Sequence, residues 1–173
     1  GVPFWDYLDA AKIPSTFYDL PSNYPPSPSQ YGHHRCISGM GTPDMLGTYG
    51  TYQYFSQDSP PRGLEEGGGK RTRLVFKGDT AKGKLIGPDD GSLKAPKPLT
   101  IEFEVHRDRA SNSALIEIQE ARILLKPGEW SRWTQVDFLP SRVPLAPHAY
   151  GICRFLLQEV APNFRLYVSP INV

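Results

Sequence analysis

A glycine-rich loop in the first third of the chain carries the polar side chains that most readily suggest chemistry. Its glycines can adopt positive φ angles, and its one proline fixes a turn. These residues are Gly39, Gly41, Gly47, Gly50 and Pro43. The side chains that this loop would present to a ligand are those of Ser38, Met40, Thr42 and Asp44. Because glycine-rich turns are more often structural than functional, the first interpretation is a loop that leads into a strand at 48–54. The competing interpretation is a loop that lines a ligand pocket.

A second polar cluster, formed by His33, His34 and Cys36, brings metal-type ligands together in the sequence. A zinc site takes four ligands, or three and a water, and neighbouring side chains of a strand point to opposite faces. Metal binding is therefore disfavoured, and we assign neither a metal ligand nor a catalytic residue to this chain. His33 and His34 are expected at the surface or facing a substrate, together with Tyr24 from the preceding proline-rich loop.

Other polar residues fit no complete catalytic pattern. His106 and His148 have no Ser or Cys near them at a spacing that suggests a nucleophile, so a partner for either would come from a distant part of the chain. The stretch 89–91 lacks the alternating oxygen ligands of a calcium loop and predicts a β-turn. The glycines at 67–69 precede a strand and not a helix, so a phosphate-binding loop is rejected.

Two short elements precede these residues. Apolar residues at spacings of three and four predict an amphipathic helix over 3–12, with Asp6, Asp9 and Lys12 facing away from the apolar side. Pro14 ends this helix, and the composition of 15–20 predicts a strand. A helix and a single strand cannot bury both faces of that strand. The pair is therefore expected to belong to a larger sheet, and a brief strand is expected at 36–37.

Beyond residue 70 the apolar residues alternate with polar ones, as in strands with one buried face. The expected strands are 71–77, 83–87, 99–106, 113–119, 121–126 and 130–138. Segments 151–160 and 164–171 form either a hairpin or strands that rejoin the sheet begun at 15–20. Glu102, Glu104, Glu117 and Glu120 are expected on the solvent face.

These patterns define a fold class and a domain organisation. The fold is predicted to be α+β and predominantly β, with an antiparallel β-sandwich or barrel-like insertion flanked by pieces of an α/β core. A polar stretch between 56 and 70 predicts a domain boundary. The predicted domains are a partial core with the glycine-rich loop at 1–58, the β-rich insertion at 70–140, and strands returning to the core at 148–173.

The composition narrows the classes of partner. Nineteen Lys and Arg against eighteen Asp and Glu give a net charge of +1, so bulk charge predicts no nucleic acid polymer as a partner. Eighteen prolines and sixteen glycines argue against a helical bundle. The sequence predicts no membrane segment, since no apolar run approaches the length that a spanning helix needs. It leaves the compartment open, whether periplasmic, secreted or other, and also whether Cys36 pairs with Cys153.

Three stretches together resemble the alkaline-phosphatase superfamily, in the branch of type I phosphodiesterases, nucleotide pyrophosphatases and related phosphohydrolases or phosphomutases. The stretches are Phe4–Leu8 with Ile13–Thr16 and Pro21–Pro26, then Ser38–Thr48, and finally Lys126–Ser131 with Phe164–Asn172. The resemblance covers nearly the whole chain.

The resemblance implies a hydrolase with an α/β core, two divalent metals, usually zinc, and a Thr or Ser nucleophile that attacks phosphorus. None of the family's metal-ligand or nucleophile motifs matches a residue here. The chain is therefore expected to be a non-catalytic interior region of a phosphoric ester hydrolase, without a cofactor of its own. Its expected partners are the rest of the core and the ester substrate, with Ser38–Asp44 near the substrate cleft.

Two other functions stay open at this point. One is a β-sandwich ligand-binding module, for glycans above all, with Tyr49, Tyr52, Tyr54 and Trp133 as stacking surfaces. The other is a structural insertion that packs against the core or mediates oligomers.

Overall fold

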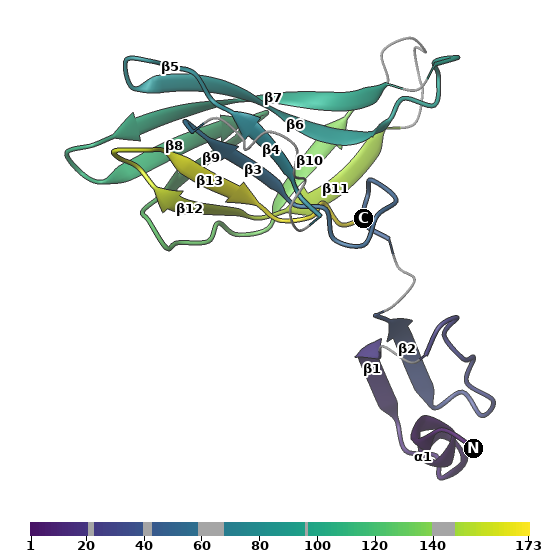
Figure 1. Ribbon diagram of the computed structural model, residues 1–173. Helices are drawn as coiled ribbons and strands as arrows, with labels where there is room; N and C mark the ends of the chain where they lie inside the picture. Colours follow the sequence, from purple (N-terminus) through teal and green to yellow (C-terminus); the bar gives the residue numbers. More distant parts are fainter. Residues whose placement is uncertain (21–22, 40–42, 59–67, 96, 140–147) are drawn as a thin grey trace. The chain divides into compact units, whose positions relative to one another are not determined.

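The structure is a computed structural model, shown in Figure 1, and it describes every residue except 21–22, 40–42, 59–67, 96 and 140–147. Backbone contacts divide the chain into two compact units, residues 1–42 and 43–173, which we call unit 1 and unit 2. The fold is α+β and predominantly β, as predicted. Among the described residues, no helix is long and apolar enough to cross a membrane.

Unit 1 is a helix followed by two strands: α1 (Phe4–Ala10), β1 (Ser15–Leu20) and β2 (His34–Ser38). The two strands are parallel, with Ser15 opposite His34 and Leu20 opposite Ser38. The helix ends where Lys12 adopts a φ of 57°, and Pro14 cannot continue it. The predicted helix and the predicted strand at 15–20 are confirmed, and the brief strand expected at 36–37 is part of β2.

One face of the β1–β2 pair is covered by the helix and the other is bare within unit 1. The Phe17 ring lies on the helix side, with its centroid 5.5 Å from that of Phe4 and 6.4 Å from that of Trp5. Tyr18 and Ile37 are opposite each other in the strand register, and their residues are 73% and 57% exposed. Unit 1 therefore buries only one side of its sheet.

Unit 2 contains a five-stranded antiparallel sheet in the order β5-β6-β7-β8-β9. Its strands are β5 (Phe76–Lys77), β6 (Thr80–Asp89), β7 (Pro98–Asp108), β8 (Ser113–Ile118) and β9 (Ala121–Leu125). Burial alternates along β7, because its apolar side chains face inward and its carboxylates face out. Glu102 and Glu104 pair there with Lys84 and Lys82 of β6, at 3.2 Å and 3.6 Å.

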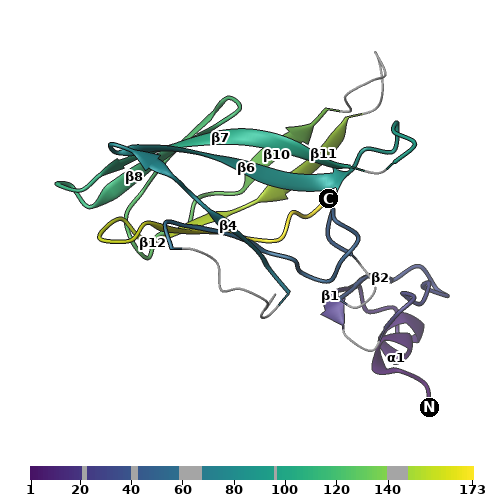
Figure 2. The ribbon, with the colours of Figure 1, turned by 45° about the horizontal axis from the view of Figure 1, so that its top comes forward.

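A second sheet of unit 2 faces the first (Figure 2). It is ordered β12 (Phe155–Glu159), β13 (Arg165–Val168), β3 (Gln53–Ser56), β4 (Lys70–Arg73), and only its β3–β4 pair is parallel. The strands β10 (Thr134–Phe138) and β11 (Ala149–Cys153) form an antiparallel pair, and Arg154 alone separates β11 from β12. Of the two arrangements left open for the last two segments, the structure has the hairpin, in which β12 pairs with β13.

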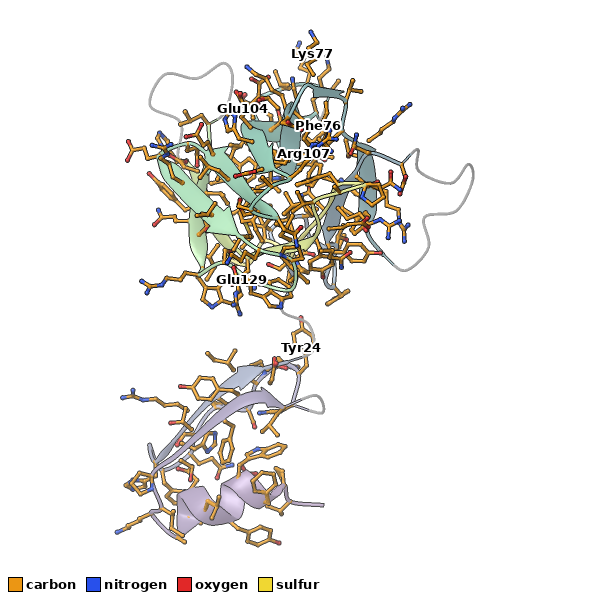
Figure 3. All side chains as sticks on the ribbon, turned by 90° about the vertical axis from the view of Figure 1, so that its left-hand side faces the viewer. Tyr24, Phe76, Lys77, Glu104, Arg107 and Glu129 are labelled. Atoms are coloured by element: carbon orange, nitrogen blue, oxygen red, sulfur yellow. The ribbon has the colours of Figure 1, made fainter. Side chains whose placement is uncertain are left out.

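Side chains from both sheets meet in one core. Phe55 of β3 packs edge-on against Phe103 of β7, with ring centroids 4.8 Å apart. The Gln53 amide is also buried and bridges the sheets, donating to the carbonyl oxygen of Ile86 at 2.7 Å and accepting from its N–H at 2.8 Å. Figure 3 shows Arg107 beside Phe76 at the edge of this core, and the guanidinium carbon lies 4.1 Å from the ring centroid.

Several boundaries differ from the predictions. The strand predicted at 48–54 is β3 at 53–56, because the residues before it fold around Asp44. The strand predicted at 130–138 starts at Thr134, and Trp130 instead bridges to Leu156 of β12. The division between units falls after residue 42 and not between 56 and 70, because β3 pairs with β4 and β13. Residues 59–67 of that predicted boundary lie outside the described residues.

Candidate functional site

The predicted site residues of unit 1 lie at opposite ends of its two parallel strands. Leu20 and Ser38 end β1 and β2 at the same edge, and the backbone N–H of Asn23 donates to the Leu20 carbonyl at 3.3 Å, so Tyr24 follows from that edge. His33 lies at the other edge, where its carbonyl accepts a hydrogen bond from the Ser15 N–H at 2.9 Å. Carboxyl ends of parallel strands are where α/β sheets bind ligands.

The glycine-rich loop leaves unit 1 from this carboxyl edge. Ser38 is buried at the end of β2, and Asp44 lies in unit 2. Met40 and Thr42 are outside the described residues. A Cβ at Gly39 would lie 2.8 Å from the carbonyl carbon of Asp19, so the start of the loop needs a glycine where it passes β1. The role of this loop at a substrate cleft stays a prediction.

Asp44 holds its own loop together in unit 2. One oxygen of its buried carboxylate accepts from the N–H groups of Leu46 and Thr48, and the other accepts from those of Gly50 and Thr51, at 2.8 to 3.1 Å. The Thr48 hydroxyl adds a bond of 2.7 Å. Burial acts to raise the pKa of Asp44, but these hydrogen bonds outweigh it and lower the pKa below its usual value. This carboxylate therefore serves a structural purpose.

Asp9 plays the corresponding part in unit 1, and the prediction that it faces away from the apolar side is wrong. The residue is 1% exposed, and its carboxylate accepts from the Ser29 hydroxyl and from the N–H groups of Gln30, Tyr31 and His33, at 2.7 to 3.0 Å. Burial favours the neutral acid, but these donors lower the pKa of Asp9 to about 2. The bonds tie the helix to the loop that enters β2.

His34 and Cys36 are also held by structural contacts. The Nε2 of buried His34 lies 3.2 Å from the carbonyl oxygen of Ser27, and its Nδ1 lies 3.8 Å from Asp9 without a hydrogen bond. The Cys36 sulfur accepts from the Asn23 amide at 2.9 Å. Among the described residues, no three metal-type side chains gather into a group that could hold an ion.

The two cysteines are free thiols in different units. Cys153 is fully buried in the core of unit 2, where burial raises the pKa of its thiol to about 12. At neutral pH that thiol is protonated, so it is no nucleophile.

Unit 2 carries a run of aromatic side chains that the sequence only partly indicated. Tyr52 and Tyr54 of the predicted stacking set lie beside Tyr167, which is the register partner of Tyr54 and stacks on Tyr52 at a centroid distance of 5.1 Å. Trp130 meets Tyr167 edge-on at 5.7 Å. Arg154 links Trp133 to this run, because its guanidinium carbon lies 5.1 Å from the centroid of the Trp130 ring and 5.8 Å from that of the Trp133 ring.

The aromatic run reaches an open groove between the β8–β9 turn and the β10–β11 pair. Its volume is about 600 Å³, and its lining includes Trp133 and Tyr150 together with Gln119, Glu120 and Asp137. The sequence pattern indicated Trp133 for stacking but gave no signal for Tyr150, because only the β10–β11 register places Tyr150 opposite Asp137.

Comparison with known proteins adds no relative: no family model, no curated protein and no solved structure matches this chain. A functional assignment therefore rests on the residues and their geometry.

Proposed function

We propose that this chain is a non-catalytic region of a metal-dependent phosphoric ester hydrolase of the phosphodiesterase and nucleotide pyrophosphatase type, where it shapes or covers the substrate cleft. The motif resemblance to the alkaline-phosphatase superfamily suggests this class. The nucleophile and the two divalent metals would come from the rest of the hydrolase.

One structural observation carries the proposal: the parallel β1–β2 pair of unit 1 is covered on one face only. Parallel sheets occur almost only in α/β proteins, where both faces are covered. Here the uncovered face presents Tyr18 and Ile37 to solvent. An α/β core that continues this sheet and covers that face is the partner that such a surface needs.

The position of the glycine-rich loop supports a place at the cleft. Open α/β sheets bind ligands beyond the carboxyl ends of their strands, and this loop starts at the carboxyl end of β2. Tyr24 follows β1 at the same edge. In this proposal Tyr24 and the loop that follows the buried Ser38 face the substrate. His33 lies at the amino ends of the two strands and is therefore not among the proposed substrate-facing residues.

The test compares two exposed tyrosines in the intact hydrolase. Tyr24→Ala and Thr42→Ala should each lower kcat/KM on a phosphodiester such as bis-p-nitrophenyl phosphate by about tenfold. Tyr31→Ala is the matched control, because Tyr31 is similarly exposed but lies near His33 at the amino edge. Asp44 is a poor choice for substitution, since its loss would unfold the loop it holds. Unchanged kcat/KM in both Tyr24→Ala and Thr42→Ala would reject the cleft role.

A further inference from the structure

Polar side chains line the groove beside β10 and β11 and are fixed in place by hydrogen bonds. Gln119 pairs with the backbone of Asp137 as a strand would, donating to its carbonyl at 2.8 Å and accepting from its N–H at 3.1 Å. One oxygen of the Asp137 carboxylate lies 2.8 Å from Nδ1 of His148, which the Tyr150 hydroxyl also contacts at 3.2 Å. These bonds hold the polar side chains of the groove in one orientation before any ligand arrives.

Two large rings line the groove and are each more than half exposed. Trp133 is 55% exposed and Tyr150 is 54% exposed, and both line the groove. Exposed aromatic faces are the surfaces on which the C–H faces of sugar rings stack, while a carboxylate accepts hydrogen bonds from hydroxyls and an amide both accepts and donates them.

The charge of the groove lining limits the classes of ligand that the groove can bind. Among the described residues that line this groove, Glu120 and Asp137 are the charged ones, and neither Lys nor Arg is present. Within this groove the two carboxylates disfavour phosphates, sulfates and uronates by like-charge repulsion, so a neutral sugar is favoured there.

We propose that unit 2 binds a neutral polysaccharide, with one sugar unit in the groove between Trp133 and Tyr150. A second hollow of about 550 Å³ adjoins the first at Thr134, and its lining includes Trp130 together with the charged residues Arg122, Arg132 and Glu129. The Arg154 guanidinium lies within 6 Å of both the Trp130 and the Trp133 ring, and the aromatic run continues from Trp130 to Tyr167 and Tyr52. Because this aromatic run extends beyond the groove, a chain of several sugar units fits the surface better than a monosaccharide. The inference does not depend on the hydrolase proposal, because it uses unit 2 alone.

The experiment titrates the whole 173-residue chain with soluble neutral polysaccharides, namely a β-glucan, a xylan and a galactomannan, and follows binding by isothermal titration calorimetry and affinity electrophoresis. At least one should bind saturably. Trp133→Ala and Tyr150→Ala should each weaken that binding by about tenfold. Tyr31→Ala is the matched control, since Tyr31 is 59% exposed but belongs to unit 1, and the affinity of this variant should equal that of the parent chain.

Circular dichroism and melting curves establish that each variant is folded, and Trp133→Phe separates loss of the ring from loss of the fold, because it should retain part of the affinity. Three results would overturn the proposal: no saturable binding to any of the three neutral polysaccharides, affinity unchanged in both alanine variants, or tighter binding to polygalacturonate or to single-stranded DNA than to every neutral polysaccharide.

Discussion

Asp9 and Asp44 have the same structural role in the two units, which is to accept hydrogen bonds from a loop. Each is a buried carboxylate surrounded by backbone N–H groups of an irregular loop, and each accepts at least four hydrogen bonds. Loops of this kind leave N–H groups that no strand satisfies, and a carboxylate with two oxygens can satisfy several of them at once. Ionised Asp is therefore part of the architecture in both places.

The stability of unit 1 should depend on pH through Asp9. The folded pKa of about 2 lies below the usual 3.8, so the carboxylate stabilises the fold above about pH 4, and that contribution is lost as the pH falls towards 2. A Trp130→Phe, Trp133→Phe variant leaves Trp5 as the only tryptophan and reports unit 1 by fluorescence. The melting temperature of unit 1 in this variant, followed by Trp5 fluorescence, should drop by about 5 °C or more between pH 4 and pH 2.

The same variant with Asp9→Asn supplies the comparison for this titration. Asn accepts through one oxygen only, so unit 1 should melt at lower temperature at pH 7 and lose its pH dependence below pH 4. If the acid profile were the same with and without the Asp9→Asn substitution, other carboxylates would control the acid transition.

At the level of strands and helices, period-two alternation located most of the strands of unit 2, because a sheet with one buried face records its register in the sequence. β7, for example, alternates Leu99, Ile101 and Phe103 with exposed residues. Asp9 was misplaced because most of the donors it binds are backbone groups, which a side-chain pattern does not show. The groove at Tyr150 needed the pairing of β10 with β11, a contact between segments separated by a proline-rich stretch of the sequence.

Gly83 in the middle of β6 tests how tightly the two sheets fit. A Cβ at this position would lie 2.3 Å from the Phe103 ring, and that ring cannot retreat easily because it packs on Phe55 at 4.8 Å. Gly83→Ala should destabilise unit 2 by about 1–3 kcal/mol in urea unfolding. Gly91→Ala, where no atom lies within 4 Å of the new Cβ, should leave the stability nearly unchanged. Equal stability of the two variants would mean that the ring moves aside at no cost.

The bare face of β1 and β2 gives a prediction that separates a lone chain from one within a larger core. Tyr18→Asp should leave the melting temperature of the 173-residue chain almost unchanged, because Tyr18 is largely exposed there. If the chain belongs to a larger hydrolase as proposed, the same change in that protein would bury an unpaired charge and cost on the order of 3 kcal/mol. Tyr49→Asp in unit 2 is the control that both proteins should tolerate. Equal tolerance of Tyr18→Asp in both would contradict a covered sheet face.

Across the whole molecule, the two units differ in how much they depend on a partner. Unit 2 closes a core between two sheets, with Phe55, Phe103 and Phe138 almost fully buried. Unit 1 leaves one face of a parallel strand pair open. A division of labour follows from the two proposals: unit 1 provides attachment to an α/β core and the route to its cleft, and unit 2 provides an independent folded module with a binding surface.

This division predicts how metal should be distributed. If the nucleophile and the metal ligands belong to the rest of the hydrolase, the purified 173-residue chain equilibrated with zinc and then gel-filtered should retain less than about 0.1 zinc per chain, measured by mass spectrometry of the metal. The intact hydrolase treated in the same way should retain about two. Stoichiometric zinc on the short chain would place ligands within it, and His33→Ala with Cys36→Ala would then show whether that cluster holds the ion. Zinc missing from the intact protein, with phosphodiesterase activity that chelators do not reduce, would reject the metal-dependent class altogether.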